Sequence, residues 1–319
     1  MIRATGRKII QIHMKRCKAA RPAKAERAAV AVCLIVLSLF ALPSLAKNPT
    51  PPASQTDSLE DCVALLSQPS TVNNDPAMPV PLRVVSWNTR KYLHPGAAEY
   101  LQKISSRLDM LMLQETMRDQ PAQPPRLPER AFSPGYVSGD SISGVETRSH
   151  VPFDLQCRLQ FLEPWLRTPK AVSVIRTPFR SQSLLTINIH AINFTIGSGA
   201  YAKQLGDLGR LLAVHTGPVL FGGDLNNWNP WRKRALAQFV NKHALHKVQF
   251  APDWRSRHLG SPVDGIFLRG LVALDATALP TRLSDHNPVY VSMLLDRQTR
   301  PQGAAEAQTS TAVPVTIRP

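Results

Sequence analysis

The stretch that decides the fold is Leu220-Phe221-Gly222-Gly223-Asp224-Leu225-Asn226. Residues 218–221 form a short apolar run between turn residues, which is typical of a buried strand. The two glycines permit a tight turn at the end of this strand, and alternation places Asp224 and Asn226 on the same side. A carboxylate beside an amide can bind a metal, a water molecule or a phosphoryl oxygen. Gly, Asp and Asn are also ordinary turn formers, so a plain turn remains the alternative.

Apolar strands and amphipathic helices alternate on both sides of this stretch, which predicts a layered α/β domain over residues 80–296. Residues 119–134 are polar and rich in Pro, so we expect a long surface loop there. The pattern predicts strands at residues 81–88, 109–115, 171–175, 184–193, 262–268 and 289–295, with shorter ones near 137 and 144, and helices at 97–107, 201–215 and 229–243.

The first 46 residues have the composition of a targeting segment. Residues 1–27 carry nine Lys or Arg and one Glu, which is +8 of the formal charge of +16. Residues 28–46 are uncharged, apolar in the middle and end in small residues, as a signal peptide does. A retained membrane anchor is the alternative. We therefore expect an extracytoplasmic protein, either periplasmic or secreted after cleavage, or one tethered to the inner membrane through residues 28–46.

Two further segments flank the expected domain. Residues 47–79 are rich in Pro, Ser, Thr and Asn and are expected to be a linker with one short helix near 58–66. Residues 297–319 lack any periodicity and are expected to be a disordered tail. Cys62 and Cys157 lie outside the targeting segment, and they either pair in an oxidising compartment or remain two buried thiols.

The charge outside residues 1–27 favours an acidic partner without being extreme. The remaining +8 is typical of a moderately basic enzyme domain and excludes a histone-like protein. Arg232-Lys233-Arg234 begins a predicted helix and is either part of a surface for a polyanion or an ordinary solvated helix face. We expect the domain to act as a monomer on nucleic acid or another phosphodiester.

Polar side chains that can bind a hard cation or a phosphate stand beside six of the apolar strands. Carboxylate and amide oxygens suit Mg²⁺, Mn²⁺ or Ca²⁺, and no Cys and His set has zinc spacing. Histidines with carboxylate partners suit proton transfer. Each residue alone could be a surface exit, but six such places together favour one site. The residues are Asn88, Glu115, His190, Asp224 with Asn226, Asp264, and Asp285 with His286.

These residues belong to six short motifs whose order and content resemble the endonuclease/exonuclease/phosphatase superfamily, and a little-characterised bacterial branch of it in particular. The resemblance spans about residues 82–295 and implies a four-layer α/β sandwich with two central mixed β-sheets flanked by helices. It places the site where the strand ends meet. The motifs occupy residues 86–88 (SWN), 113–115 (LQE), 188–190 (NIH), 223–226 (GDLN), 263–267 (VDGIF) and 284–286 (SDH).

The resemblance also implies a metal site and a role for most of these side chains. Mg²⁺, with Mn²⁺ or Ca²⁺ as alternatives, would be held mainly by Glu115, with Asn88 and Asp285 nearby. Asp224 and Asn226 would position the attacking water and the phosphate.

Two histidines complete the set that the resemblance implies. His286, oriented by Asp264, would transfer a proton or stabilise the pentavalent state. His190 is similar to the second histidine of the secreted deoxyribonuclease and sphingomyelinase branches, which favours general phosphodiester hydrolysis over DNA repair. Which histidine is the acid and which the base stays open.

The predicted function is therefore a divalent-metal-dependent phosphodiesterase, specifically an extracytoplasmic nuclease. A phospholipid phosphodiesterase or phosphatase of the same fold is the alternative. A non-catalytic binding module is a third reading, and the complete polar set argues against it. Because one fold hosts many substrates, the sequence leaves the substrate open, together with cleavage of the N-terminal segment and pairing of the two cysteines.

Overall fold

The structure is a computed structural model that describes residues 53–70, 77–119, 124–195 and 197–296. The expected targeting segment at residues 1–46 and the expected tail at 297–319 both lie outside these ranges. Within the described ranges, no helix is long and apolar enough to cross a membrane.

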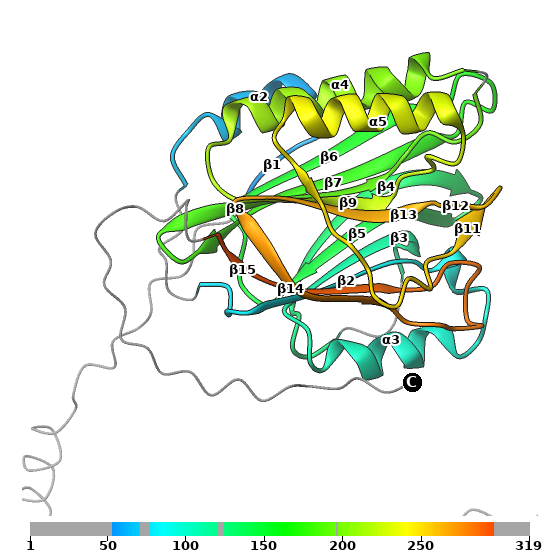
Figure 1. Ribbon diagram of the computed structural model, residues 1–319, viewed down its shortest axis with the longest axis horizontal. Helices are drawn as coiled ribbons and strands as arrows, with labels where there is room; N and C mark the ends of the chain where they lie inside the picture. Colours follow the sequence, from blue (N-terminus) through cyan, green and yellow to red (C-terminus); the bar gives the residue numbers. More distant parts are fainter. Residues whose placement is uncertain (1–52, 71–76, 120–123, 196, 297–319) are drawn as a thin grey trace, which may run out of the picture. The chain divides into compact units, whose positions relative to one another are not determined.

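The described residues form four layers (Figure 1). Two mixed sheets pack face to face, with α2 (Leu59–Leu66), α4 (Gly199–Val214) and α5 (Pro230–Lys242) outside one of them. Helix α3 (Ala97–Ser105) covers the other sheet, and a short 3-10 turn, η2 (Arg90–Tyr92), follows the second sheet's central strand. This is the four-layer α/β sandwich that the sequence predicted.

The first sheet has seven strands and carries the stretch that decides the fold. Its strands pair antiparallel except at β1 with β6 and at β8 with β9, which are parallel. The order is β1 (Ser54–Thr56), β6 (Leu155–Leu162), β7 (Pro169–Phe179), β8 (Gln182–His190), β9 (Val219–Asp224), β13 (Asp264–Arg269) and β10 (His246–Lys247).

The second sheet has six strands, and its only parallel pair among the described residues is β2 with β3. A separate two-stranded ribbon pairs β11 (Arg257–His258) with β12 (Ser261–Pro262). The order in the second sheet is β14 (Leu271–Ala278), β15 (Val289–Leu295), β2 (Leu82–Asn88), β3 (Met110–Met117), β5 (Ser141–Ser149) and β4 (Glu129–Ser138).

Apolar side chains fill all three spaces between the layers. Between the two sheets, Met112 of the second sheet and Leu220 of the first belong to one fully buried cluster. Leu208 of α4 packs on the outer face of the first sheet, and Leu101 of α3 packs on the outer face of the second. Because both faces of each sheet are covered, the central strands are continuous apolar runs, and their polar residues collect at the ends.

The structure differs from the predictions in several segments. The expected linker at residues 47–79 includes α2, as predicted, but also β1, which extends the first sheet as an edge strand. The expected loop at residues 119–134 gives way at Glu129 to β4, whose burial partly alternates although the prolines of this segment suggested a loop. Strands β6 and β14 were not predicted, because their polar residues mask a half-buried alternation.

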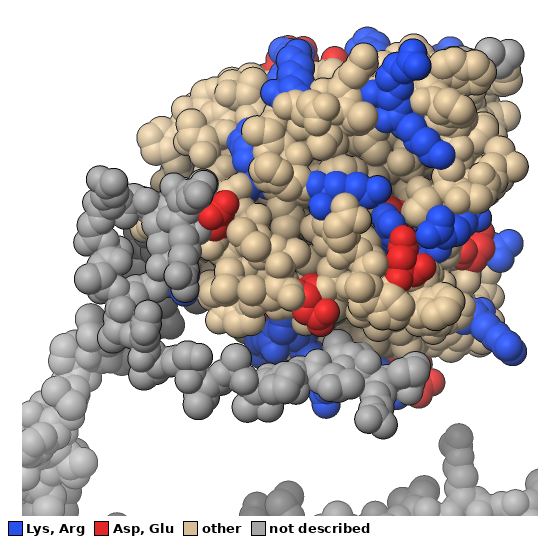
Figure 2. Space-filling model, viewed as in Figure 1, with Lys and Arg blue, Asp and Glu red and all other residues tan. Residues whose placement is uncertain are grey.

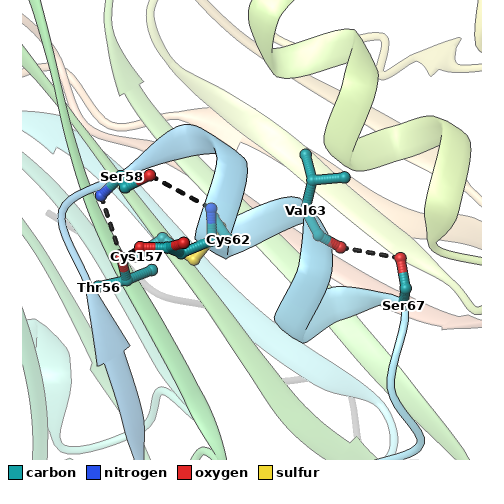
Figure 3. The surroundings of a disulfide bond; sticks show 7 residues. Thr56, Ser58, Cys62, Val63, Ser67 and Cys157 are labelled. Carbon is teal, nitrogen blue, oxygen red and sulfur yellow. Dashed lines mark hydrogen bonds between the residues drawn. A yellow bond between two sulfur atoms is a disulfide. The ribbon is translucent and has the colours of Figure 1, made fainter.

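A disulfide bond fastens α2 to the first sheet (Figure 3). Cys62 on α2 pairs with Cys157 on β6, and both residues are fully buried. Ser58 caps the helix by accepting a hydrogen bond from the backbone N–H of Asp61. Of the two alternatives that the sequence left open, pairing is the one that the structure adopts.

Candidate active site

Three of the predicted site residues form a row across the first sheet. His190 ends β8 opposite Asp224 on the parallel strand β9, and Asp224 lies opposite Asp264 on the antiparallel strand β13. The row follows from strand register alone, because each of the three residues stands at the same level of neighbouring strands. All three side chains are at least nine-tenths buried.

The second sheet supplies Asn88 and Glu115 from the ends of two parallel strands. Asn88 Nδ2 donates to Asp224 Oδ2 at 3.1 Å and lies 3.4 Å from Glu115 Oε1, so it joins the two sheets at the site. Its Oδ1 accepts from the backbone N–H of Arg90. Asn88 thus orients two carboxylates through its amide N–H groups.

Glu115 is turned into the site by a β-bulge. The pairing of β3 with β5 skips between Leu113 and Thr116, which leaves one extra residue in β3, and Glu115 has a positive φ of 48°. A bulge of this kind re-aims a side chain that alternation would otherwise fix. The structure therefore explains how the acidic end of an otherwise apolar strand faces the site.

His286 and Asp264 form a fixed pair. His286 Nδ1 lies 3.0 and 2.9 Å from the two carboxylate oxygens of Asp264, and the backbone carbonyl of His286 accepts from Trp87 Nε1. Its Nε2 is 4.0 Å from Asp224 Oδ2. Burial lowers the pKa of His286, but the carboxylates of Asp264 and Asp224 outweigh burial and raise this pKa to about 10.

His190 has a different environment from His286. Its Nε2 lies 3.5 Å from Asp224 Oδ2, 3.8 Å from Glu115 Oε1 and 2.9 Å from Lys170 Nζ. Burial, followed by the positive charge of Lys170, holds the pKa of His190 well below its usual value. Burial also raises the pKa of Asp224. The pKa values of the two histidines are therefore shifted in opposite directions, whereas the sequence left open which of them is the acid and which the base.

Asn226 and Asp285 complete the predicted set. Asn226 has a positive φ of 46°, and its side-chain amide donates to the carbonyl of Ala191. Asp285 is half exposed and lies 3.5 Å from Arg90 Nε. Six of the eight predicted residues line one cavity, and the other two, Asn88 and Asp264, contact residues that line it. The cavity of about 260 Å³ is lined by Glu115, Lys170, His190, Asn193, Phe194, Asp224, Asn226, His258, Val263, Asp285 and His286.

The sequence missed Lys170 and Glu163, which stand at the neighbouring ends of β7 and β6. Glu163 is fully buried, accepts from the backbone N–H groups of Asn193 and Phe194, and lies 3.9 Å from Lys170 Nζ. Neither residue belongs to a motif. Glu163 reaches the site because it follows strand β6, which was not predicted. The alternation of apolar and polar residues in β6 is the sequence signal that could have predicted this strand.

Arg232 is a third residue whose position the sequence did not predict. It was expected on a basic helix face, but it is fully buried at the start of α5. Its guanidinium donates to the backbone carbonyls of Asn226 and Asn193 and lies 5.0 Å from the ring of Trp228. Arg232 thus ties together the loops that follow β8 and β9, which carry the site.

The donors around the cavity fit a hard divalent cation. Among the described residues, one grouping of three His or carboxylate side chains has its ligand atoms within 4.8 Å of one another, namely Asp224, Asp264 and His286. This differs from the predicted set of Asn88, Glu115 and Asp285. Asp264 and His286 Nδ1 are already paired with each other, whereas the carboxylates of Glu115, Asp224 and Asp285 all line the cavity and are the oxygen donors available to a cation. Oxygen donors of this kind suit Mg²⁺, Mn²⁺ or Ca²⁺.

Comparison with known proteins identifies the family. The model of the Endonuclease/Exonuclease/phosphatase family matches residues 85–286, a range that contains all eight predicted site residues. The chain belongs to this family. Enzymes of the endonuclease/exonuclease/phosphatase family are hydrolases that act on phosphoester bonds, and they usually use a divalent metal.

Little-characterised bacterial members of the family are similar over most of their length. The UPF0294 protein of Yersinia pseudotuberculosis is 38% identical over 220 residues, which cover 66% of this chain and 82% of that protein. The UPF0294 protein of Vibrio parahaemolyticus is 36% identical over 224 residues, which cover 67% of this chain and 78% of that protein.

Solved structures of the family share the fold. A family protein from Bacteroides thetaiotaomicron has a TM-score of 0.53 at 17% identity and covers 70% of this chain and 98% of its own. The human Nocturnin catalytic domain with bound sulfate has a TM-score of 0.53 at 14% identity and covers 68% of this chain and 94% of its own. At these identities the likeness shows the fold alone.

Proposed function

We propose that the protein is a divalent-metal-dependent phosphodiesterase that cleaves nucleic acid outside the cytoplasm. The observation that carries this proposal is the convergence of Glu115, Asp224 and the two histidines on one cavity, from strands of both sheets. Phosphodiester hydrolysis needs negative charge to be neutralised, a water to be placed in line, and a proton for the leaving oxygen. This cavity offers groups for each need.

The side chains divide these tasks by their geometry. Glu115 and Asp285 would hold the cation, with Asn88 orienting Glu115, and the cation would neutralise charge on the phosphoryl oxygens. Asp224 is held by Asn88 and stands in contact with His190, so it can orient the attacking water. Asp264 fixes His286 through Nδ1, which leaves Nε2 to face the cavity and act on the phosphoryl group or leaving oxygen.

The charge of the surface supports a polyanionic substrate. The chain carries a formal +16, of which +8 lies outside residues 1–27. Lys and Arg cover more of the face shown in Figure 2 than Asp and Glu do. Because contacts with phosphates release counterions, cleavage of nucleic acid should weaken as salt is raised.

The test is a substrate panel run with the purified protein in Mg²⁺ and in excess chelator. We expect hydrolysis of DNA or RNA that is lost with chelator and falls about 10²-fold or more in Asp224→Asn and His286→Ala. Asp207→Asn on α4 is the matched control, since its surface ion pair with Lys203 contributes little. A protein that leaves DNA, RNA and simple phosphodiesters intact in Mg²⁺, Mn²⁺ and Ca²⁺ would refute the proposal.

The metal site has a direct test of its own. Calorimetric titration with Mg²⁺ should show binding that weakens at least about tenfold in Glu115→Gln, because one carboxylate ligand is lost. Glu99→Gln on the exposed face of α3 is the control. Equal Mg²⁺ affinity in the wild type and Glu115→Gln would remove Glu115 from the proposed ligand set.

A phospholipid phosphodiesterase remains the second candidate. The observation that favours it is the exposure of Trp165, Leu166 and Phe194, which are more than half exposed. Leu166 and Phe194 line a groove that adjoins the site. Exposed apolar clusters mark surfaces that bind membranes or other partners. Release of phosphorylated head groups from phospholipid vesicles, without cleavage of nucleic acid, would establish this candidate instead.

Two observations support the extracytoplasmic part of the proposal. The Cys62–Cys157 disulfide is typical of oxidising compartments, and residues 28–46 have the composition of a signal peptide or anchor. A fusion to alkaline phosphatase should be active, and thiol labelling of intact cells should find Cys62 and Cys157 oxidised. An inactive fusion together with free thiols would place the protein in the cytoplasm. Fractionation would then separate a cleaved protein from an inner-membrane anchored one.

A further inference from the structure

A second hollow of about 230 Å³ continues from the proposed active site. It shares Glu115, Lys170, His190 and Phe194 with the cavity that holds the polar set. A group bound in this groove would therefore lie directly beside a phosphate held between Glu115 and His190. Its other lining residues are Lys91, Gly135, Tyr136, Ser143, Gly144, Glu163, Leu166, Thr168, Pro169 and Ala171.

Two β-bulges on either side of β5 build the groove. On one side, the bulge in β3 turns Glu115 toward the site. On the other, the pairing of β4 with β5 skips between Pro134 and Val137, which leaves Gly135 and Tyr136 out of register. Both bulges lie beside Gly144, where an added Cβ would be too close to the carbonyl oxygen of Ser133. Gly135 and Gly144 therefore line the hollow with backbone, and Tyr136 lines it beside them.

The walls of the groove combine aromatic rings with cations. Tyr136 is 43% exposed and Phe194 is 53% exposed, although both line a hollow. Lys91 Nζ lies 5.5 Å from the centre of the Tyr136 ring, and Lys170 stands at the junction with the active site. Rings left open beside positive charges are the combination that proteins use to bind single-stranded nucleic acid.

The size of the groove limits what it can hold. Sites that enclose a whole small ligand occupy about 300–1,000 Å³, and this hollow is smaller. It suits a single flat ring system, and not a long acyl chain. In a duplex the bases are paired and stacked, so a base would have to leave the stack at a cost of a few kcal/mol to reach Tyr136. In a single strand the bases are already free to stack on protein side chains.

Building on the proposed nuclease activity, we propose that Tyr136 and Phe194 bind an unstacked nucleobase next to the scissile phosphate. The preferred substrate is then single-stranded nucleic acid. Lys91 and Lys170 contact the adjoining phosphates, and the polar set beyond them holds the phosphate that is cleaved. Tyr136 and Phe194 set specificity, and they take no part in the chemical step.

The test compares three strands of one sequence: a single strand, its duplex, and a single strand whose central nucleotides lack their bases. The wild type should cleave the intact single strand at least about tenfold faster, in kcat/KM, than the duplex or the abasic strand. Each of Tyr136→Ala and Phe194→Ala should lower kcat/KM on the intact single strand by about 5- to 100-fold, as the loss of one stacking contact does.

Two variants separate stacking from a structural role. Tyr136→Phe keeps the ring and should restore cleavage of the intact single strand to nearly the wild-type rate. Trp231→Ala removes an exposed aromatic residue from α5, away from the groove, and should match the wild type on all three strands. On the abasic strand Tyr136→Ala should lower kcat/KM by less than about twofold, because no base remains to stack.

The outcomes distinguish this inference from the proposed function. If the wild type cleaves no strand, the nuclease proposal itself fails. If it cleaves single, duplex and abasic strands equally and Tyr136→Ala changes nothing, the nuclease proposal stands and the base-binding groove is refuted. If Tyr136→Ala and Phe194→Ala instead lose activity only on phospholipid vesicles, the groove binds lipid, and the inference is again refuted.

Discussion

At the scale of single residues, Asp224 owes its position to the glycine that precedes it. Gly223 has a φ of 137°, a conformation that side chains with a Cβ rarely adopt, and an added Cβ would collide with the carbonyl oxygen of Ile189. Strand β8 can therefore approach β9 closely, which brings His190 beside Asp224. The buried bond from Gln114 Nε2 to Asn188 Oδ1, at 2.6 Å, joins the two sheets just below this point.

Gly223→Ala should therefore harm both stability and catalysis. We expect the free energy of unfolding to fall by about 1–3 kcal/mol. Activity should fall at least about tenfold, because Asp224 shifts relative to His190. Chemical denaturation and kcat/KM on nucleic acid measure the two effects. Gly206→Ala, at an exposed position within α4 where a Cβ meets nothing, should instead stabilise by about 0.5–1 kcal/mol. Equal effects of the two substitutions would contradict this account.

His215, the C-cap residue of α4, should make stability depend on pH. Burial lowers its pKa to about 4, although its bond with the Pro218 carbonyl opposes this shift. Between pH 6.5 and 4 His215 is protonated in the unfolded chain but not in the folded protein, so stability falls as the pH falls. The loss reaches about 3 kcal/mol near pH 4. Unfolding curves at pH 7, 5 and 4 measure this loss. Between pH 7 and pH 4 the free energy of unfolding of the wild type should fall by about this amount relative to that of His215→Gln.

At the scale of elements, the loops after β8 and β9 depend on α5. The helix begins at Pro230 with Asn229 as its cap, and its first turn presents Arg232 inward to the carbonyls of Asn193 and Asn226. Among the described residues, no carboxylate contacts the guanidinium. Carbonyl oxygens and the rings of Trp228 and Tyr201 contact its positive charge instead. The sequence showed three basic residues in a row, and only packing reveals that the first is buried.

Arg232→Gln should loosen these loops while leaving the sheets in place. Losing the donors to two buried carbonyls should cost about 2–3 kcal/mol of stability. The displacement of Asn226 should lower kcat/KM by about tenfold or more. Arg234→Gln, on the exposed face of the same helix, is the control and should change neither quantity. An Arg232→Gln protein with wild-type activity would show that α5 does not position the site.

At the scale of the whole molecule, the sequence predicted the elements that have a regular hydrophobic period. The layered α/β domain, the central strands and the polar residues at their ends follow from apolar runs and turn residues, whereas the four-layer arrangement was implied by the resemblance to the family. Strands β6 and β14 could not be predicted, because a partly exposed strand resembles a loop in sequence. Lys170 and Glu163 were not predicted as site residues. The contact of Lys170 with His190 depends on which strands become neighbours, and this could not be predicted either.

The disulfide is the covalent link that acts on the whole described fold. Cys62 and Cys157 are 95 residues apart, so their bond restricts the unfolded chain strongly. Replacing both with Ala should lower the free energy of unfolding by about 2–5 kcal/mol. A reducing agent should lower the melting temperature of the wild type toward that of the double variant and leave the variant unchanged. A wild type that is indifferent to reduction would contradict a structural disulfide.

The two bulges beside Gly144 have a consequence for how this enzyme can diversify. The neighbours of Glu115 in β3 and of Tyr136 in β4 both pair with the same short part of β5, so any slip of that strand would displace the proposed metal ligand Glu115 and the groove together. Substrate preference is then free to drift through residues 163–168 and 193–195, which border the hollow from loops. Natural variants with altered substrate preference should have their substitutions in those loops, while Gly144 and the two bulges beside it stay unchanged.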